Sequence, residues 1–136
     1  MIYKGYFDGS SKGNPGPAQC GWAVLDDQDE IVDHEIRSAT EDRTNNVAEY
    51  MGIIELFKYI FKTNKISSIN IFGDSKLVVE QLNGKWKCKS PNIKPYYEVA
   101  RRLLIDLNNK GKVVTIIWVP REENTIADSL AQKGEL

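Results

Sequence analysis

Residues 44–62 constrain the fold of this chain more than any other segment, because their apolar side chains recur with the period of an α-helix. The recurring positions are Val47, Tyr50, Ile54, Phe57 and Phe61, with Ile53, Leu56 and Ile60 beside them. This spacing predicts a helix that packs its apolar face, including the aromatic residues, against a core. Thr44, Asn45 and Asn46 precede the apolar residues and are candidates for the helix N-cap.

Short apolar segments on both sides of this helix predict a mixed sheet. Three successive antiparallel strands are expected at 2–8, 20–26 and 30–39, with turns at 10–17 and 27–29. Later elements are strands at 66–73 and 113–119, and helices from Ser75 to about Asn83, at 95–109 and at 124–133. A strand–helix–strand unit implies parallel pairing, with helices on the sheet faces. We therefore expect one α/β domain over residues 1–136, with a five-stranded mixed sheet in the order β-β-β-α-β-α-α-β-α.

The overall charge gives no sign of a nucleic-acid-binding protein, since the formal net charge is −1. Such a role must rest on a local basic patch. Lys85, Trp86, Lys87 and Lys89 form one local basic-aromatic cluster. Contact with a nucleic-acid duplex and a solvated loop with one anchoring tryptophan are about equally good interpretations of it.

Cysteine usage and hydropathy predict a cytoplasmic protein. Cys20 and Cys88 fit neither a disulfide framework nor a zinc site, and both are expected to be reduced. The N-terminus lacks the apolar core of a signal peptide, and no apolar run is long enough to cross a bilayer. We expect no membrane association and no small-molecule cofactor, with a monomer as the default state.

Two aspartates follow apolar segments that are expected to be strands. Asp8 ends the first strand, and Asp74 comes directly after the fourth. If these strands are parallel neighbours, both carboxylates emerge at one edge of the sheet, where ligands bind in α/β proteins. Either aspartate alone is better explained as a turn or cap residue, but the pair favours a site.

Two more acidic residues lie on predicted helices. Glu49 heads the apolar row that continues through Ile53 and Leu56, so it points along the buried face, where a carboxylate is costly unless paired or bound to a cation. Asp128 lies early in the last helix, where complementing the helix dipole is the simpler explanation. Four converging carboxylates would repel one another unless hard divalent cations neutralised them.

The four acidic residues lie in four distinctive segments. The first is Tyr6-Phe7-Asp8-Gly9-Ser10 with its continuation Ser11-Lys12-Gly13-Asn14-Pro15-Gly16-Pro17. The others are Thr44-Asn45-Asn46-Val47-Ala48-Glu49, Gly73-Asp74-Ser75 and Asn124-Thr125-Ile126-Ala127-Asp128. Together these segments resemble ribonuclease H of type 1 over essentially the whole chain. The resemblance implies the ribonuclease H-like fold. It also implies an endonuclease that hydrolyses the RNA strand of RNA–DNA hybrids and leaves 5′-phosphate and 3′-hydroxyl ends.

The resemblance also implies roles for individual residues. Asp8, Glu49, Asp74 and Asp128 would be catalytic ligands of two Mg²⁺ ions, with Mn²⁺ as a substitute. Nucleic-acid-binding roles would fall to Asn14, Asn45 and Asn46 in the minor groove of the hybrid, to Thr44 on a DNA phosphate, and to Lys85, Trp86 and Lys87. Helix capping remains the alternative for residues 44–46.

This chain departs from the family in two places. The region around Lys85–Lys89 lacks the longer basic insertion of several members, so we expect weaker, more salt-sensitive hybrid binding. Many members carry a histidine on a mobile loop before the last aspartate. The only histidine here is His34, expected at the surface of an outer strand. Arg121 or Glu122 in the short loop 119–124 is a candidate substitute, unless nothing replaces the histidine.

Two other classes of function stay open. A ribonuclease H-like module that binds hybrids or proteins without cutting has no need of four repelling carboxylates, although the missing histidine and insertion keep it in play. A related nuclease of the integrase or resolvase kind is disfavoured by the Thr44-Asn45-Asn46 and Gly13-Asn14-Pro15-Gly16 segments, which suit the minor groove of a hybrid.

Overall fold

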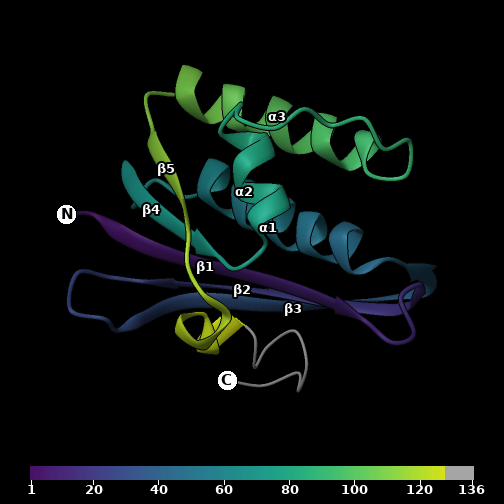
Figure 1. The fold of residues 1–136 in the computed structure, drawn as a ribbon. Coiled ribbons are helices and arrows are strands. Elements are labelled where there is room, and N and C mark those ends of the chain that lie inside the picture. The colour runs from purple at the N-terminus through teal and green to yellow at the C-terminus, as the bar shows by residue number, and fades with distance from the viewer. Residues whose placement is uncertain (128–136) are drawn as a thin grey trace.

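The computed structural model describes residues 1–127 and shows a sheet with helices on both faces (Figure 1). The strands are β1 (Tyr3–Ser11), β2 (Gly16–Leu25), β3 (Ile31–Arg43), β4 (Ser68–Gly73) and β5 (Val113–Trp118). The helices are α1 (Asn45–Lys62), α2 (Lys76–Leu82) and α3 (Lys94–Asn109), followed by a 3-10 turn, η1 (Arg121–Glu123). The expected α/β class, five strands and element order are confirmed. Residues 125–127 are helical, and the rest of the expected last helix lies outside the described residues.

The sheet is mixed, as expected, with the strand order β3-β2-β1-β4-β5. The first three strands pair as antiparallel neighbours, whereas β4 runs parallel to both β1 and β5. Helix α1 joins β3 to β4, and α2 and α3 join β4 to β5. Because β1 and β4 run parallel, their carboxyl ends lie at the same edge of the sheet. None of the helices in residues 1–127 is long and apolar enough to cross a membrane.

The β1–β2 hairpin is longer than the sequence predicted. Its ladder continues through the pairs Ser10–Gln19 and Ser11–Ala18, so the expected turn at 10–17 shrinks to four residues. The Lys12 amide donates to the Pro17 carbonyl at 2.9 Å and closes the hairpin. Glycine, serine and proline suggested a longer turn, but the backbone hydrogen bonds of a neighbouring strand overrode that local preference.

Helix α1 packs its predicted face against the sheet. Its fully buried residues include Tyr50, Ile53, Leu56, Phe57 and Ile60, and they share one core with Phe7 and Trp22 from the sheet. Thr44 is the N-cap, because its hydroxyl accepts a hydrogen bond from the Val47 amide at 3.3 Å. Phe61, at the last turn, is instead more than a third exposed, with the Lys110 ammonium 4.1 Å from its ring centroid.

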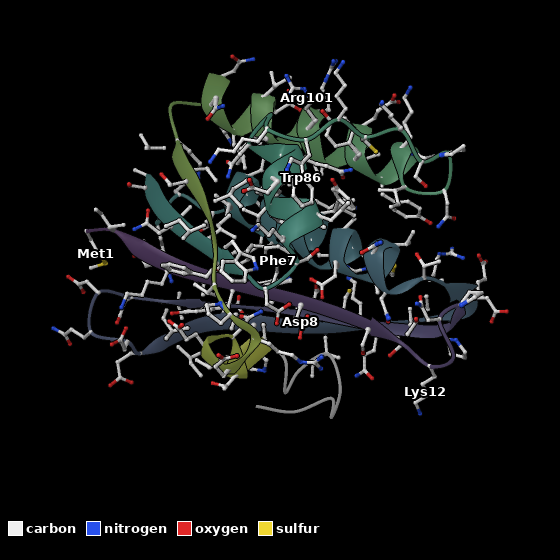
Figure 2. All side chains as sticks on the ribbon, in the orientation of Figure 1. Met1, Phe7, Asp8, Lys12, Trp86 and Arg101 are labelled. Carbon is white, nitrogen blue, oxygen red and sulfur yellow. The ribbon has the colours of Figure 1, made fainter. Side chains whose placement is uncertain are left out.

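The opposite face of the sheet carries a smaller apolar cluster. Ala23 and Leu25 form its centre, with Tyr6, Ile36 and Ile126 packed around them. Ile126 therefore brings the segment after η1 onto the face away from α1, as Figure 1 shows below the sheet. In Figure 2, Phe7 points toward the helices and Asp8 toward this second face, as the alternation of side chains along a strand requires.

Trp22 and Trp118 fall in the predicted strands 20–26 and 113–119, where a tryptophan is expected to pack in the core or against the sheet. Trp22 is buried, and His34 is exposed on the edge strand β3, as the sequence predicted. The side chain of Trp118 is instead 42% exposed, so the prediction was wrong for this residue. It ends the edge strand β5, where its indole N–H donates to the Asp74 carbonyl at 3.2 Å and the Lys76 ammonium lies 5.5 Å from the ring centroid.

Candidate active site

Three of the four sequence-selected carboxylates meet at one edge of the sheet. Asp8 lies on β1, Glu49 in the first turns of α1, and Asp74 directly after β4. One carboxylate oxygen of each residue lies within 4.8 Å of those of the other two. They line a cleft of about 520 Å³. Its lining residues are Asp8, Gly9, Ser10, Ser11, Lys12, Asn45, Glu49, Asp74 and Arg121.

The parallel pairing of β1 and β4 brings the two aspartates together. The ladder pairs Tyr6 with Phe72, and each aspartate lies two residues beyond its paired residue. Both carboxylates therefore leave the sheet at the same level, as the sequence predicted for parallel neighbours. Asp8 is buried and Asp74 is half-buried. Asp128 lies outside the described residues.

Two glycines let α1 approach the sheet closely enough for Glu49 to reach this edge. A Cβ atom on Gly9 would lie 2.2 Å from the backbone carbonyl of Ala48, and one on Gly52 would lie 2.8 Å from the Asp8 carbonyl oxygen. Both distances are shorter than real Cβ contacts allow. The helix backbone consequently packs directly on the β1 backbone beside Asp8.

Glu49 is held inside this contact, with 7% of its surface exposed. The Gly9 amide donates to Asp8 Oδ1 at 2.9 Å and to Glu49 Oε1 at 3.2 Å, so a single N–H serves two carboxylates. Glu49 Oε2 is buried and accepts no hydrogen bond within the described part of the chain. A buried, unpartnered carboxylate oxygen is costly, and a cation coordinated by it would remove that cost.

Burial is the main reason why the pKa of Glu49 lies well above its usual value. The hydrogen bond that a protonated Glu49 carboxyl can donate to Asp8, and the negative charges of Asp8 and Asp74, raise this pKa further, whereas the Gly9 N–H lowers it. A site that resists the third negative charge is suited to a ligand that supplies positive charge. Oxygen ligands of this kind favour hard divalent ions such as Mg²⁺ or Mn²⁺.

Replacing Glu49 by glutamine is expected to stabilise the metal-free protein at neutral and alkaline pH. The folded state raises the pKa of Glu49 and binds its proton more tightly than the unfolded chain, whose value is near 4.5. The free energy of unfolding must therefore fall as pH rises from about 4.5 through the folded-state pKa. Melting temperatures in a chelator, from mildly acidic to mildly alkaline pH, should fall more steeply for wild type than for Glu49→Gln. Parallel curves would contradict this expectation.

Asn14 and Asn45 are brought together at the mouth of the cleft. The backbone N–H of Asn45 donates to Asn14 Oδ1 at 2.9 Å. The side-chain Oδ1 of Asn45 accepts from the backbone N–H and the hydroxyl of Ser11. Thr44 both caps α1 and accepts from the Asn92 side chain at 3.4 Å. Asn46 is exposed in the first turn of α1. The side chains selected for nucleic-acid contact at 14 and 44–46 thus form one polar surface beside the acids.

Lys85, Trp86 and Lys87 are all exposed on the segment that leaves α2. Backbone bonds from Lys85 and Trp86 to the Glu80 carbonyl and a contact from the buried Gln81 amide to the Lys87 carbonyl hold this segment. Gln81 in turn accepts a hydrogen bond from the Tyr50 hydroxyl at 2.5 Å. Gln81 therefore links the segment 85–87 to Tyr50 of α1, the residue that follows Glu49.

Two residues at this edge carry more than the sequence indicated. Arg121 was only a candidate, and the structure places it in the lining of the acidic cleft. Asn124 begins the segment 124–128, and the sequence assigned it no role of its own. In the structure it is fully buried, and its side chain reaches the Phe7 carbonyl and Asp74. An asparagine just before a helix has the local signal of an N-cap, which hides any long-range contact.

The fold and the cleft define an α/β protein with an acidic site suited to divalent cations at the carboxyl ends of parallel strands. A family model described as reverse transcriptase-like matches residues 6–134. The crystal structure of RNase H1 from Halobacterium salinarum NRC-1 superposes with a TM-score of 0.85 at 35% identity, over 98% of this chain and 96% of that one. The chain belongs to the ribonuclease H family of type 1.

Two relatives by sequence and one further solved structure are also similar to this chain. A bifunctional protein of Mycobacterium tuberculosis is 40% identical over 124 residues, which are 91% of this chain but 33% of that protein. Ribonuclease HI of Halobacterium salinarum is 37% identical over 95% of this chain and 62% of its own length. The chain thus spans about one third to three fifths of these relatives. The structure of LC11-RNase H1 in complex with an RNA/DNA hybrid matches with a TM-score of 0.84 at 26% identity, over 96% of this chain and 94% of that one.

Proposed function

We propose that this chain is an endoribonuclease that hydrolyses the RNA strand of RNA–DNA hybrids in a metal-dependent reaction. The observation that carries the proposal is the convergence of Asp8, Glu49 and Asp74 around a buried carboxylate oxygen without a partner. Membership of the ribonuclease H family supports it, and so does the hybrid bound to LC11-RNase H1. We also propose that residues 1–136 form one domain that acts as a monomer.

The donor set fits two Mg²⁺ ions, with Mn²⁺ as a substitute. Asp8, Glu49 and Asp74 would hold them together with Asp128, which follows Ala127 on the same chain segment. When bound, such ions lower the pKa of a water molecule and neutralise charge on the departing oxygen. By holding the ions, the carboxylates would bring the attacking water into line with the scissile phosphate. Water adds to phosphorus, the bond to the 3′-oxygen breaks, and that oxygen takes a proton, leaving 5′-phosphate and 3′-hydroxyl ends.

The polar surface beside the cleft supplies the proposed selectivity for hybrids. Asn14, Asn45 and Asn46 present amide groups, which suit the 2′-hydroxyls and base edges in the shallow minor groove of an A-like duplex. Thr44 and Asn92 together offer a hydroxyl and an amide to a backbone phosphate of the DNA strand. Only the RNA strand carries 2′-hydroxyls, so these contacts would orient the hybrid with its RNA strand in the acidic cleft.

Cleavage of a labelled RNA–DNA hybrid in Mg²⁺ tests this function, with duplex DNA and duplex RNA as matched substrates. Cleavage of the hybrid alone, with 5′-phosphate ends on the RNA products, is the expected result. Cleavage of duplex DNA would point to a nuclease of the integrase or resolvase kind. Binding of the hybrid without cleavage in Mg²⁺ or Mn²⁺ would overturn the proposal and leave a binding module.

Replacing Arg121 by alanine is expected to lower kcat on the hybrid about 10²-fold with little change in KM. An arginine side chain in the acidic cleft offers positive charge and several N–H donors to the phosphate as negative charge develops there. Arg121→Lys should recover part of the loss, since it restores the charge but not the planar fork. Arg101→Ala, an exposed change on α3, serves as the control. An unchanged kcat for Arg121→Ala would remove Arg121 from the mechanism.

Replacing Lys85 and Lys87 together by alanine is expected to weaken hybrid binding and to reduce the salt slope of log K by about 2. Each lysine that neutralises a phosphate releases condensed counterions, so its loss lowers affinity and salt dependence together. Lys62→Ala combined with Lys65→Ala is the matched control. Both lysines lie at or just beyond the C-terminus of α1, whereas Glu49 lies near its N-terminus. Titrations at several salt concentrations measure the slope. Equal slopes for wild type and the Lys85/Lys87 double variant would exclude the basic segment from the interface.

A further inference from the structure

Asn124 joins the strands that carry two of the acids. Its Nδ2 atom donates to the Phe7 carbonyl at 2.9 Å, next to Asp8, and makes a longer contact of 3.5 Å to Asp74 Oδ2. The side chain is 0% exposed. Asn124 Oδ1 is also buried and accepts no hydrogen bond from residues 1–127. One amide group therefore spans β1, the end of β4 and the segment that leads into the last helix.

This arrangement limits how Asp74 can move. Asp74 follows the last residue of β4, and its backbone carbonyl accepts a hydrogen bond from the Trp118 indole N–H at 3.2 Å. Carboxylate repulsion from Asp8 and Glu49 would turn the Asp74 side chain out of the cleft, because like charges separate when they can. The Asn124 amide is a neutral donor anchored on β1 by its shorter bond. It offers its second N–H to Asp74 Oδ2 on the side where β1 lies.

We propose that Asn124 is a positioning residue that holds the Asp74 carboxylate toward Asp8 in the geometry that binds a divalent cation. This inference rests on the proposed function, because it concerns the same site. Groups behind a metal ligand fix its orientation, and losing one costs about 10- to 100-fold in metal affinity. Asn124 acts through Asp74 and touches neither the phosphate nor the attacking water.

Mg²⁺ binding measured by calorimetry on the whole chain tests this proposal. Asn124→Ala is expected to weaken Mg²⁺ binding about 10- to 100-fold. Asn83→Ala is the matched control, since Asn83 also donates from Nδ2 to a backbone carbonyl, that of Ile116, at 3.1 Å, away from the acids. Both variants should melt at lower temperature than wild type, but only Asn124→Ala should lose metal affinity. Equal affinity in the two variants would overturn the proposal.

A double-mutant cycle separates an action through Asp74 from a general loosening of the fold. The readout is the rise in melting temperature that Mg²⁺ produces in wild type, Asn124→Ala, Asp74→Asn and the double variant. If Asn124 acts through Asp74, Asn124→Ala should remove much of this rise in wild type and almost none in the Asp74→Asn background. Equal losses in the two backgrounds would overturn the proposal.

Two further outcomes are decisive. If Asn124→Ala does not fold, Asn124→Leu, which has a similar size but no hydrogen-bond donor, is measured in its place, and unchanged Mg²⁺ affinity there would overturn the inference. A wild-type protein that binds neither Mg²⁺ nor Mn²⁺ would overturn the proposed function together with this inference. Normal binding by wild type and by Asn124→Ala would overturn only the inference.

Discussion

Asp8→Asn is expected to abolish cleavage of the RNA strand while leaving the fold and hybrid binding in place. Asp8 is the buried acid that shares the Gly9 N–H with Glu49, and its carboxylate lies among those of Glu49 and Asp74. Losing its charge removes several kcal/mol of metal-based stabilisation, which corresponds to a fall in kcat of about 10³-fold or more. Single-turnover cleavage in Mg²⁺ measures the effect.

Asp27→Asn is the matched control for this substitution, because Asp27 is exposed in the turn between β2 and β3. It should cleave like wild type. Asp8→Asn should also melt at a higher temperature than wild type without metal, since it removes one of the repelling charges. Retention of more than about a tenth of the wild-type rate by Asp8→Asn would be incompatible with a ligand at this position.

Gly9→Ala is expected to destabilise the fold strongly, because the added methyl group collides with the backbone of α1. The new Cβ would lie 2.2 Å from the Ala48 carbonyl and 2.5 Å from the Glu49 amide, and neither backbone group can turn aside as a flexible side chain would. Helix α1 must then move away from β1, at a cost of about 3 kcal/mol or more. Denaturant unfolding measures the loss of stability, and Mg²⁺ affinity should fall with it because Glu49 moves with the helix.

Gly5→Ala tests the same change on the same face of β1. A Cβ at Gly5 would meet the tips of the Ile69 and Leu56 side chains at 3.2 Å, and these can give by a few tenths of an ångström. Its cost should be clearly smaller than that of Gly9→Ala, and Mg²⁺ affinity should stay near the wild-type value. If the two variants lost equal stability, the close contact between α1 and β1 at Gly9 would not be what places Glu49.

The local pattern of residues was enough to predict the class of fold and most of its elements. The apolar spacing in 44–62 predicted α1 and its buried face, because helical periodicity lies within the segment itself. Thr44, one of three candidates for the N-cap, does cap α1, and Ser75, where the next helix was predicted to begin, caps α2, since capping depends on neighbours three residues away. The sequence also selected Asp8 and Asp74 together, because parallel strands place their carboxyl ends at one edge.

Other features depend on which distant segments pack together. Trp118 has the apolar character of a core residue, yet β5 is an edge strand and leaves its ring half uncovered. The hairpin between β1 and β2 was longer than its glycines and prolines suggested, because a ladder hydrogen bond depends on the opposite strand. Sequence alone therefore placed the turn but misjudged its length.

The sequence by itself determined that this chain makes an α/β fold with acids at the ends of two strands. It did so because helix and strand periodicity, caps and strand-end residues are local properties. Only the tertiary structure decided that Glu49 Oε2 is buried without a partner, that Arg121 lines the cleft, and that Asn124 reaches the Phe7 carbonyl. Burial and hydrogen bonding between segments far apart in sequence depend on the packing of α1 on β1 and on the contact of Ile126 with the opposite face of the sheet. No local pattern encodes that packing.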